Sequence, residues 1–255
     1  MRSFRTKLIS LLFAAAGCDP NSSANTPVDA SAPEAATNDL AKSQAAWRPL
    51  DPDEPFEGKS LSEWAVEWMR WSFSQDSCES STFDPDGSQC LLYQDDPDLS
   101  VFYMAYAPSE HPRTRCKVPR GRAIVVPLAN FWFDNVGAMT IKTAAELEQD
   151  AAKALESIRD LKLRIDGESI TDLERFIVQP TQFSYRVPPA PNWYSCNGTE
   201  DVGDITVEPA VLTGYYALLP PPELGVHEIE YGGALTYEGE DYALLMINHF
   251  EVVDD

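Results

Sequence analysis

A short apolar stretch near the middle of the chain is the clearest strand signal. Residues 123–129 are aliphatic or β-branched with one proline and carry no charge, and Pro119 and Gly121 stand in front of them. A short run of this kind is typical of a strand with both faces covered. Bulky aromatic side chains follow at residues 131–133 and supply material for a core or a pocket. We therefore expect the domain to be organised around this strand.

Two other stretches have the 3.6-residue period of amphipathic helices. Residues 60–74 begin with a capping box, in which Ser60 is the N-cap and the Glu63 side chain returns to its backbone. Residues 143–160 begin with a second capping box and carry an aliphatic stripe on one face. Both stretches are expected to be helices.

Alternation of apolar and polar residues predicts the remaining strands. Those segments are residues 99–106, 161–165, 215–219, 227–231 and 242–250. Repeated short strands separated by turn residues are typical of a sandwich. The sequence thus predicts a mainly β fold: an antiparallel β-sandwich, immunoglobulin-like or jelly-roll-like, with the two helices appended.

The first 46 residues have the pattern of an export signal and a tether. Residues 1–17 combine three basic residues with a short apolar run, too short to span a bilayer, and end before Cys18. The residues before Cys18 resemble the lipobox of bacterial lipoproteins, which implies lipidation of Cys18 and a stable membrane anchor. The alternatives are an ordinary cleaved signal or a short buried helix. Residues 18–46 lack aromatic residues and predict a disordered tether, with 47–255 as a single domain.

The charge of the chain excludes one class of partner. The net charge is −22, and removal of residues 1–17 leaves 16 basic and 41 acidic residues, or −25. Such a chain repels nucleic acid and anionic lipid headgroups. We expect no nucleic-acid partner.

Four cysteines besides Cys18 are expected to form two disulfides, because the chain has an export signal. Three pairings are possible, and we favour Cys90–Cys116 with Cys78–Cys196. A metal site would need a closer spacing such as Cys-x-x-Cys, which the sequence lacks. No metal and no cofactor are therefore expected.

A tryptophan stripe is the main candidate for a ligand site. Trp64, Trp68 and Trp71 lie on one face of the first expected helix, with Glu63 and Glu67 beside them. The stripe would either pack against the sheet or form an aromatic platform for a sugar. The two glutamates could act as an acid and a base, although carboxylates on one helix stand too close to bracket a glycosidic bond easily.

Other polar residues favour structural roles. Asp84 and Asp86 precede Gly87 as in a calcium loop, but the bidentate glutamate is missing, so a turn is expected. His227 is expected to point outward or to cap a sheet edge, and a metal set would require it to converge with His111 and His249. Four arginines, which we expect to pair with acidic loops, stand close together. They are Arg113, Arg115, Arg120 and Arg122.

Several motifs together carry a family resemblance. They include the three tryptophans followed by Ser72, Asp86-Gly87 before Cys90, residues 115–123 around Cys116, and Gly225-Val226-His227 before Gly232-Gly233. In this order they resemble an uncharacterised family of secreted bacterial and archaeal proteins, over most of residues 60–235. Met69 and residues 207–212 depart from the family's pattern. The resemblance implies export and the Cys90–Cys116 pair, but no reaction.

The sequence predicts a lipid-anchored, exported envelope protein that binds or supports a partner without catalysis. The partners expected are the membrane, through lipidated Cys18, and a polysaccharide or another envelope protein. The alternative is a carbohydrate-active hydrolase that uses the carboxylates near the tryptophan stripe. No phosphate loop and no zinc-protease or serine-hydrolase motif occurs in the sequence.

Overall fold

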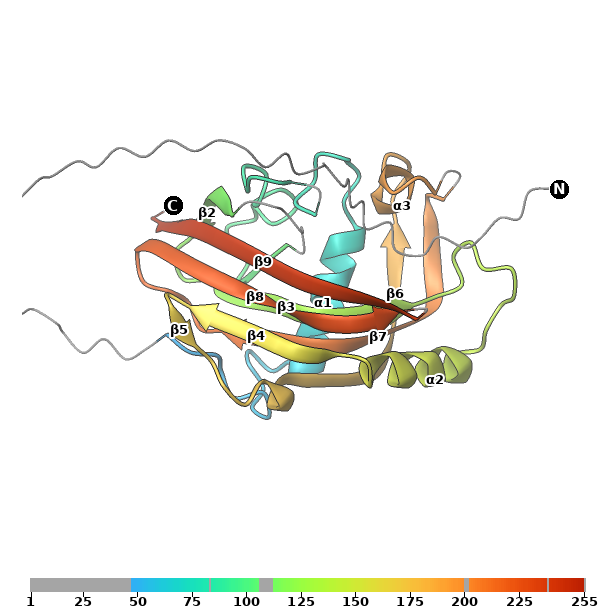
Figure 1. Ribbon diagram of the computed structural model, residues 1–255. Helices are drawn as coiled ribbons and strands as arrows, with labels where there is room; N and C mark the ends of the chain where they lie inside the picture. The colour runs from blue at the N-terminus through green and yellow to red at the C-terminus, as the bar shows by residue number, and fades with distance from the viewer. Residues whose placement is uncertain (1–46, 83, 106–111, 200–201, 238, 255) are drawn as a thin grey trace, which may run out of the picture. The chain divides into compact units, whose positions relative to one another are not determined.

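The described residues form nine strands and three helices, with one short 3-10 turn. The computed structural model describes residues 47–82, 84–105, 112–199, 202–237 and 239–254. The elements are, in chain order, α1 (Leu61–Phe73), β1 (Val101–Tyr103), β2 (Arg113–Pro119), β3 (Ala123–Phe133), α2 (Ala144–Leu155), β4 (Arg159–Ile165), β5 (Glu168–Ser169), η1 (Leu173–Phe176), β6 (Ile177–Val187), α3 (Trp193–Cys196), β7 (Ile205–Leu219), β8 (Gly225–Tyr237) and β9 (Glu240–Val253) (Figure 1).

The strands form two sheets, so the predicted sandwich with helices attached is confirmed. One sheet has the order β1-β3-β7-β6 and the other the order β2-β9-β8-β4-β5. Most neighbours are antiparallel, but β1 pairs with β3 and β2 pairs with β9 in parallel. Each parallel pair joins strands that no hairpin connects, so no tight turn dictates their direction. The sheets are therefore mixed rather than purely antiparallel.

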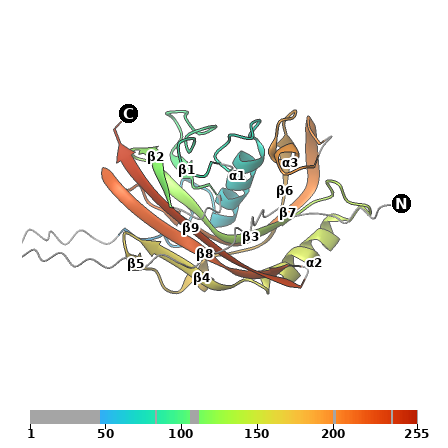
Figure 2. The ribbon, with the colours of Figure 1, turned by 45° about the horizontal axis from the view of Figure 1, so that its top comes forward.

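The three long strands β7, β8 and β9 bend, and α1 lies inside their curve (Figure 2). Nine of the thirteen residues of α1 are buried, which makes this helix part of the core. By contrast, α2 buries only Leu147 and Ala151 and covers the sheet from outside. The difference follows from sequence, since the tryptophans of α1 have far more apolar surface to bury than the alanines of α2.

Both predicted capping boxes are present, and the element ends differ from the predicted ones by a few residues. Ser60 accepts from the Glu63 backbone while the Glu63 carboxylate accepts from the Ser60 backbone, and Thr143 and Glu146 do the same for α2. The second helix ends at Leu155, before the expected residue 160, because β4 begins at Arg159. The buried strand at residues 123–129 extends to Phe133 as β3.

Two glycines allow neighbouring strands to approach closely. A Cβ on Gly214 would lie 2.4 Å from the Ala129 carbonyl oxygen, and one on Gly232 would lie 1.9 Å from the Leu244 carbonyl oxygen. Any side chain at either position would force the strands apart. The close approach of the neighbouring strands gives a steric reason for glycine at both positions.

The predicted disulfides are confirmed in the favoured pairing. Cys90 bonds to Cys116 and Cys78 bonds to Cys196. The first joins the loop after α1 to β2, and the second joins that loop to α3 across 118 positions. The expected turn at Asp84 is also present, because its carboxylate accepts from the backbone N–H groups of Gly87 and Gln89.

Candidate functional site

The tryptophan stripe of α1 packs in the core. Trp64, Trp68 and Trp71 are at most 6% exposed, so no ring face is open to a ligand. The Trp68 indole donates to the Met104 carbonyl at 2.8 Å, and Trp71 stacks on Tyr103 with 5.5 Å between ring centroids. The packing interpretation of the stripe is confirmed.

The two glutamates beside the stripe both have partners. Glu63 caps α1, and the hydrogen bonds from the Ser60 backbone and hydroxyl hold the pKa of its carboxyl below the ordinary value. Glu67 pairs with Arg70 at 3.0 Å on the same helix. Both carboxylates therefore make contacts within or at the start of α1.

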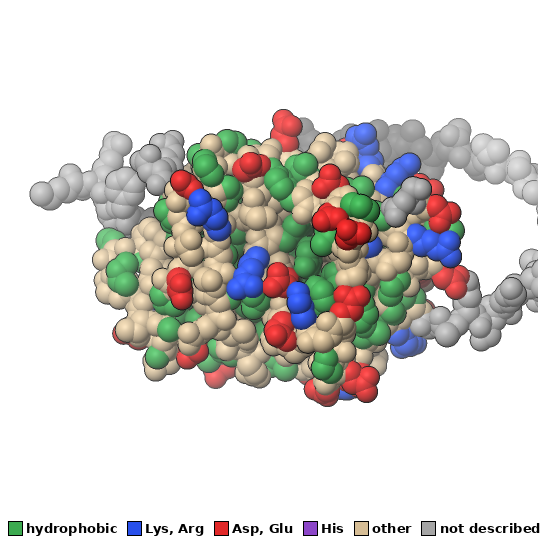
Figure 3. Space-filling model, turned by 180° about the vertical axis from the view of Figure 1, so that it is seen from behind, with side chains coloured by type: hydrophobic (Ala, Val, Ile, Leu, Met, Phe, Trp, Pro, Cys, Tyr) green, Lys and Arg blue, Asp and Glu red, His purple; other side chains and the backbone are tan. Residues whose placement is uncertain are grey.

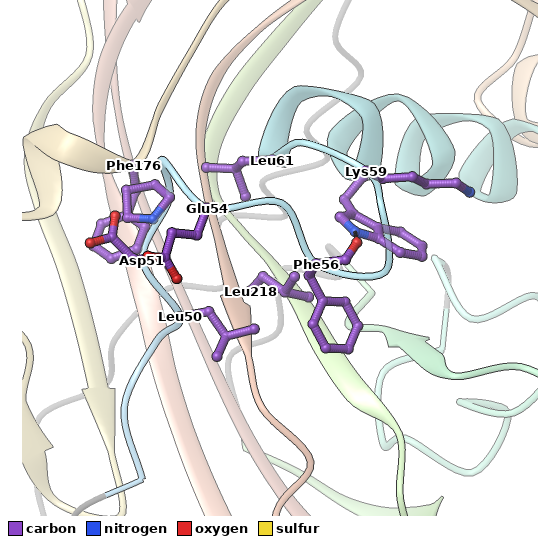
Figure 4. Close-up of a pocket in the computed structure, with 10 residues that line it drawn as sticks. Leu50, Asp51, Glu54, Phe56, Lys59, Leu61, Phe176 and Leu218 are labelled. Atoms are coloured by element: carbon purple, nitrogen blue, oxygen red, sulfur yellow. Dashed lines mark hydrogen bonds between the residues drawn. The ribbon is translucent and has the colours of Figure 1, made fainter.

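A small pocket lies beside the start of α1 (Figure 4). Leu50, Phe56, Leu61 and Leu218 form its apolar wall, and Asp51 is among the charged residues at its rim. The part that admits the centre of a water molecule is only about 10 Å³, which is room for about one water. Pockets for organic ligands are far larger. This pocket is therefore a packing gap between the first described segment and the sheet.

An aromatic cluster gathers at the opposite end of α1. We call it the Phe73 cluster: Phe73, Trp132, Tyr185, Trp193 and Tyr194. Phe73 stacks on Tyr185 with 4.2 Å between centroids and on Tyr194 with 5.8 Å, while Trp132 and Trp193 meet edge to face at 5.2 Å. Phe73 and both tyrosines are buried, whereas the two tryptophans are half-buried. The cluster thus joins α1, β3, β6 and α3 and reaches the surface at its tryptophans.

The Asp134 carboxylate contacts the two tyrosines of this cluster. The Tyr185 and Tyr194 hydroxyls donate to Asp134 Oδ2 at 2.7 Å and 3.0 Å, and the Val136 backbone N–H donates to Asp134 Oδ1 at 2.8 Å. The two hydroxyls also contact each other. Burial, as the largest cause, and the charge of Asp134 raise the pKa of both phenols far above the ordinary value.

Asp134 and the hydroxyls of Tyr185 and Tyr194 together form what we call the Asp134 site. Their contacts decide what this site can do chemically. Both phenols stay protonated and donate, so neither Tyr185 nor Tyr194 is a nucleophile or base at neutral pH. Asp134 already accepts three hydrogen bonds and is not a free general base. The site instead fixes the end of β3 against β6 and α3. What it leaves partly at the surface is the half-buried rings of Trp132 and Trp193.

The two histidines within the described residues, His227 and His249, have separate partners. His227 lies between Asp166, 2.8 Å from its Nδ1, and the Glu223 carbonyl oxygen, 2.9 Å from its Nε2. Its ring meets Trp47 edge to face at 5.0 Å. The prediction that His227 points outward is wrong: residues two apart share a sheet face, and Ile229 is buried. His249 pairs instead with Glu228 at 2.8 Å.

No group of three metal-binding side chains gathers within the described residues. His111 and Cys18 lie outside those residues. The metal set and the lipidation site considered from sequence therefore gain no support from geometry.

Two of the four arginines form ion pairs with the acidic loop before β1, as expected, and the other two have different partners. Arg113 reaches Asp84 at 3.1 Å, and Arg115 reaches Asp86 at 2.8 Å. Arg120 pairs with Asp254 at 3.3 Å. Arg122 differs, because it donates to the backbone carbonyls of the acidic loop after Cys90.

Both signs of charge are interspersed with hydrophobic side chains on the face shown in Figure 3. A surface of this kind attracts no highly charged polymer by itself. The expectation that nucleic acid is no partner rests, as before, on the net charge.

Sequence reasoning missed the Asp134 site. Trp132 was singled out as core or pocket material, but Asp134 at the end of the same strand was not. Tyr185 is 51 positions and Tyr194 60 positions from Asp134, and no local pattern links them. The only signal was an acidic residue directly after an aromatic strand.

No model of a protein family, no curated protein and no solved structure matches the chain. Within the part of the chain that the structure describes, no helix combines the length and apolar character of a membrane span.

Proposed function

We propose that the chain is an exported, lipid-anchored envelope protein that binds a macromolecular partner and catalyses no reaction. The observation that carries this proposal is the separation of two surfaces along the long strands. The tether would enter the domain at one end, and the half-buried tryptophan rings of the Phe73 cluster lie at the other.

The entry point is Trp47, the first described residue. Its indole donates to the Pro220 carbonyl at 2.7 Å, and Leu50 donates from its backbone to Leu218 at 2.8 Å, both just at the end of β7. The tether of residues 18–46 would therefore join the domain at this end.

The Asp134 site lies at the opposite end. Strands β3 and β7 run antiparallel, with Ile124 beside Leu219 and Phe133 beside Val211. The 11 residues of β3 span roughly 35 Å. An anchor at Cys18 would thus present the Phe73 cluster to a partner away from the tether entry. The two disulfides fit an oxidising compartment, as export requires.

The hydrolase alternative would use two glutamates that already have structural contacts. Glu63 serves as a helix cap and Glu67 pairs with Arg70. The tryptophan rings of α1 are buried. No feature of the described residues therefore favours a hydrolase.

Fractionation of cells that express the full chain tests the anchor. Wild-type protein is expected in the membrane pellet, and Cys18→Ser is expected in the soluble exported fraction, with both disulfides intact by mass spectrometry. Membrane pelleting of Cys18→Ser to the wild-type extent would reject lipid anchoring. Reduced cysteines in freshly isolated wild-type protein would reject export.

A further inference from the structure

A closed loop beside the Asp134 site presents two apolar side chains to solvent. We call it the 135–142 loop. The Asn135 side chain donates to the Lys142 carbonyl at 2.9 Å and accepts from the Lys142 backbone N–H at 2.8 Å. Lys142 also pairs with Asp150 on α2. The Asn135 side chain thus joins the two ends of the loop. The loop is followed directly by Thr143, the N-cap of α2.

The tip of this loop is strongly exposed and apolar. Met139 is 86% exposed and Ile141 is 72% exposed, and neither lies in a regular element. A single exposed apolar residue is common and needs no explanation. Met139 and Ile141 stand together on one loop whose two ends are joined by the Asn135–Lys142 hydrogen bonds.

Two further apolar side chains stand at the start of the loop. Phe133 just before it and Val136 within it are half-buried. Figure 1 shows the loop between β3 and α2 at the end of the domain that also carries α3. This is the end opposite Trp47. The loop and the Phe73 cluster therefore lie at one end of the domain.

We propose that the 135–142 loop is a docking element that inserts Met139 and Ile141 into an apolar pocket of a basic partner protein. The proposal rests on the proposed function and names the partner's chemistry. Flexible Met and aliphatic side chains suit a protein pocket, whereas a sugar would be bound by exposed aromatic ring faces. The net charge of −22 favours a partner of opposite charge.

A bilayer fits the loop less well. A membrane-inserting loop is normally flanked by free basic residues that attract anionic headgroups. The basic residue within this loop, Lys142, is already paired with Asp150. The acidic chain as a whole repels such a surface.

Site-specific photo-crosslinking of the full chain in its native cells identifies the partner. A crosslinker replaces Met139, and the matched control position is Gln149, an exposed residue of neighbouring α2. The protein captured from Met139 alone is then purified and its affinity for the full chain is measured. We expect Met139→Ser with Ile141→Ser to weaken binding about tenfold or more. Val226→Ser, which alters an equally exposed residue at the opposite end, should change the affinity less than about twofold.

Three results would overturn the docking proposal. The first is equal affinity of wild type and the double variant, and the second is the same crosslinks from Met139 and Gln149. The third is co-flotation of the Cys18→Ser chain with phosphatidylethanolamine and phosphatidylglycerol vesicles that depends on Met139 and Ile141. The first two results leave the Cys18→Ser fractionation untouched. In the third case Cys18→Ser would still pellet with membranes, and its release by the added changes Met139→Ser and Ile141→Ser separates binding by the loop from failure of the anchor.

Discussion

Asp84 and Arg113 form an ion pair inside the protein, with 3.1 Å between Oδ2 and Nη2 and side chains at most 3% exposed. Arg113 also donates to the Ser81 carbonyl at 3.3 Å and to Asn248 at 3.4 Å. The pair therefore holds the loop that contains Cys78 and Cys90 against β2 and β9. A buried pair of this kind is costly to break, because the remaining charge has no partner.

Replacement of Asp84 should destabilise the domain severely. We expect Asp84→Ala to lower the free energy of unfolding by about 3–5 kcal/mol, since Arg113 is left buried and unpaired. Urea denaturation followed by tryptophan fluorescence measures the change. The matched control is Arg120→Gln, whose pair with Asp254 is exposed, and a change of less than about 1 kcal/mol is expected there. Similar losses for both variants would show that burial does not decide the strength of these pairs.

The buried tyrosines should make the protein sensitive to alkali. An unfolded tyrosine loses its proton near pH 10, whereas burial raises the pKa of Tyr185 and keeps it protonated in the folded protein. The unfolded state therefore binds fewer protons above about pH 10, and the free energy of unfolding falls as the pH rises. Tyr185→Phe should make this fall less steep by about 1.4 kcal/mol per pH unit. Urea denaturation between about pH 9 and 11 checks it, and an unchanged slope would contradict the prediction.

The two disulfides should differ in their ease of reduction. Cys90 and Cys116 are at most 6% exposed, whereas Cys78 is exposed. Because thiol–disulfide exchange needs access to a sulfur atom, dithiothreitol should reduce Cys78–Cys196 first under native conditions. Alkylation at timed intervals followed by peptide mass spectrometry follows each bond, and Cys90–Cys116 is the internal control. Equal rates would mean that both bonds open only through global unfolding.

Gly214 should tolerate no side chain. Its φ of +145° and the 2.4 Å approach of a Cβ to Ala129 O predict that Gly214→Ala separates β3 from β7 and costs about 2 kcal/mol or more. The control is Gly121→Ala, at a φ of +87° with open space around the Cβ, where only backbone strain of about 1 kcal/mol is expected. Thermal unfolding of both variants measures the difference. A smaller loss at Gly214 than at Gly121 would contradict the steric argument.

Features set by nearby residues could be predicted from sequence. Ser60 with Glu63, and Thr143 with Glu146, each form a capping box within four residues, and the structure contains both. The turn at Asp84 was predictable for the same reason. The buried strand at 123–129 was predictable because all of its side chains are apolar, so neither face of the strand suits contact with water.

Features that depend on distant segments could not be predicted. Arg113 is 29 positions from Asp84, and Tyr194 is 60 positions from Asp134. Nothing in the local pattern says which acidic loop an arginine will reach. The tryptophan stripe shows a related limit: periodicity showed that the three rings share a helix face, but not that this face lies inside the curve of the sheet.

Because of the disulfide between Cys78 and Cys196, a cut in the backbone between them releases no fragment. The 135–142 loop is exposed and is the kind of site that proteases cut, and it lies between these two cysteines. A protease that cuts beside Met139 would divide the backbone, yet both fragments would stay covalently joined. The cut protein would migrate as one band on a gel without reductant and as two with it. A protease could therefore cut the 135–142 loop without releasing either half of the protein.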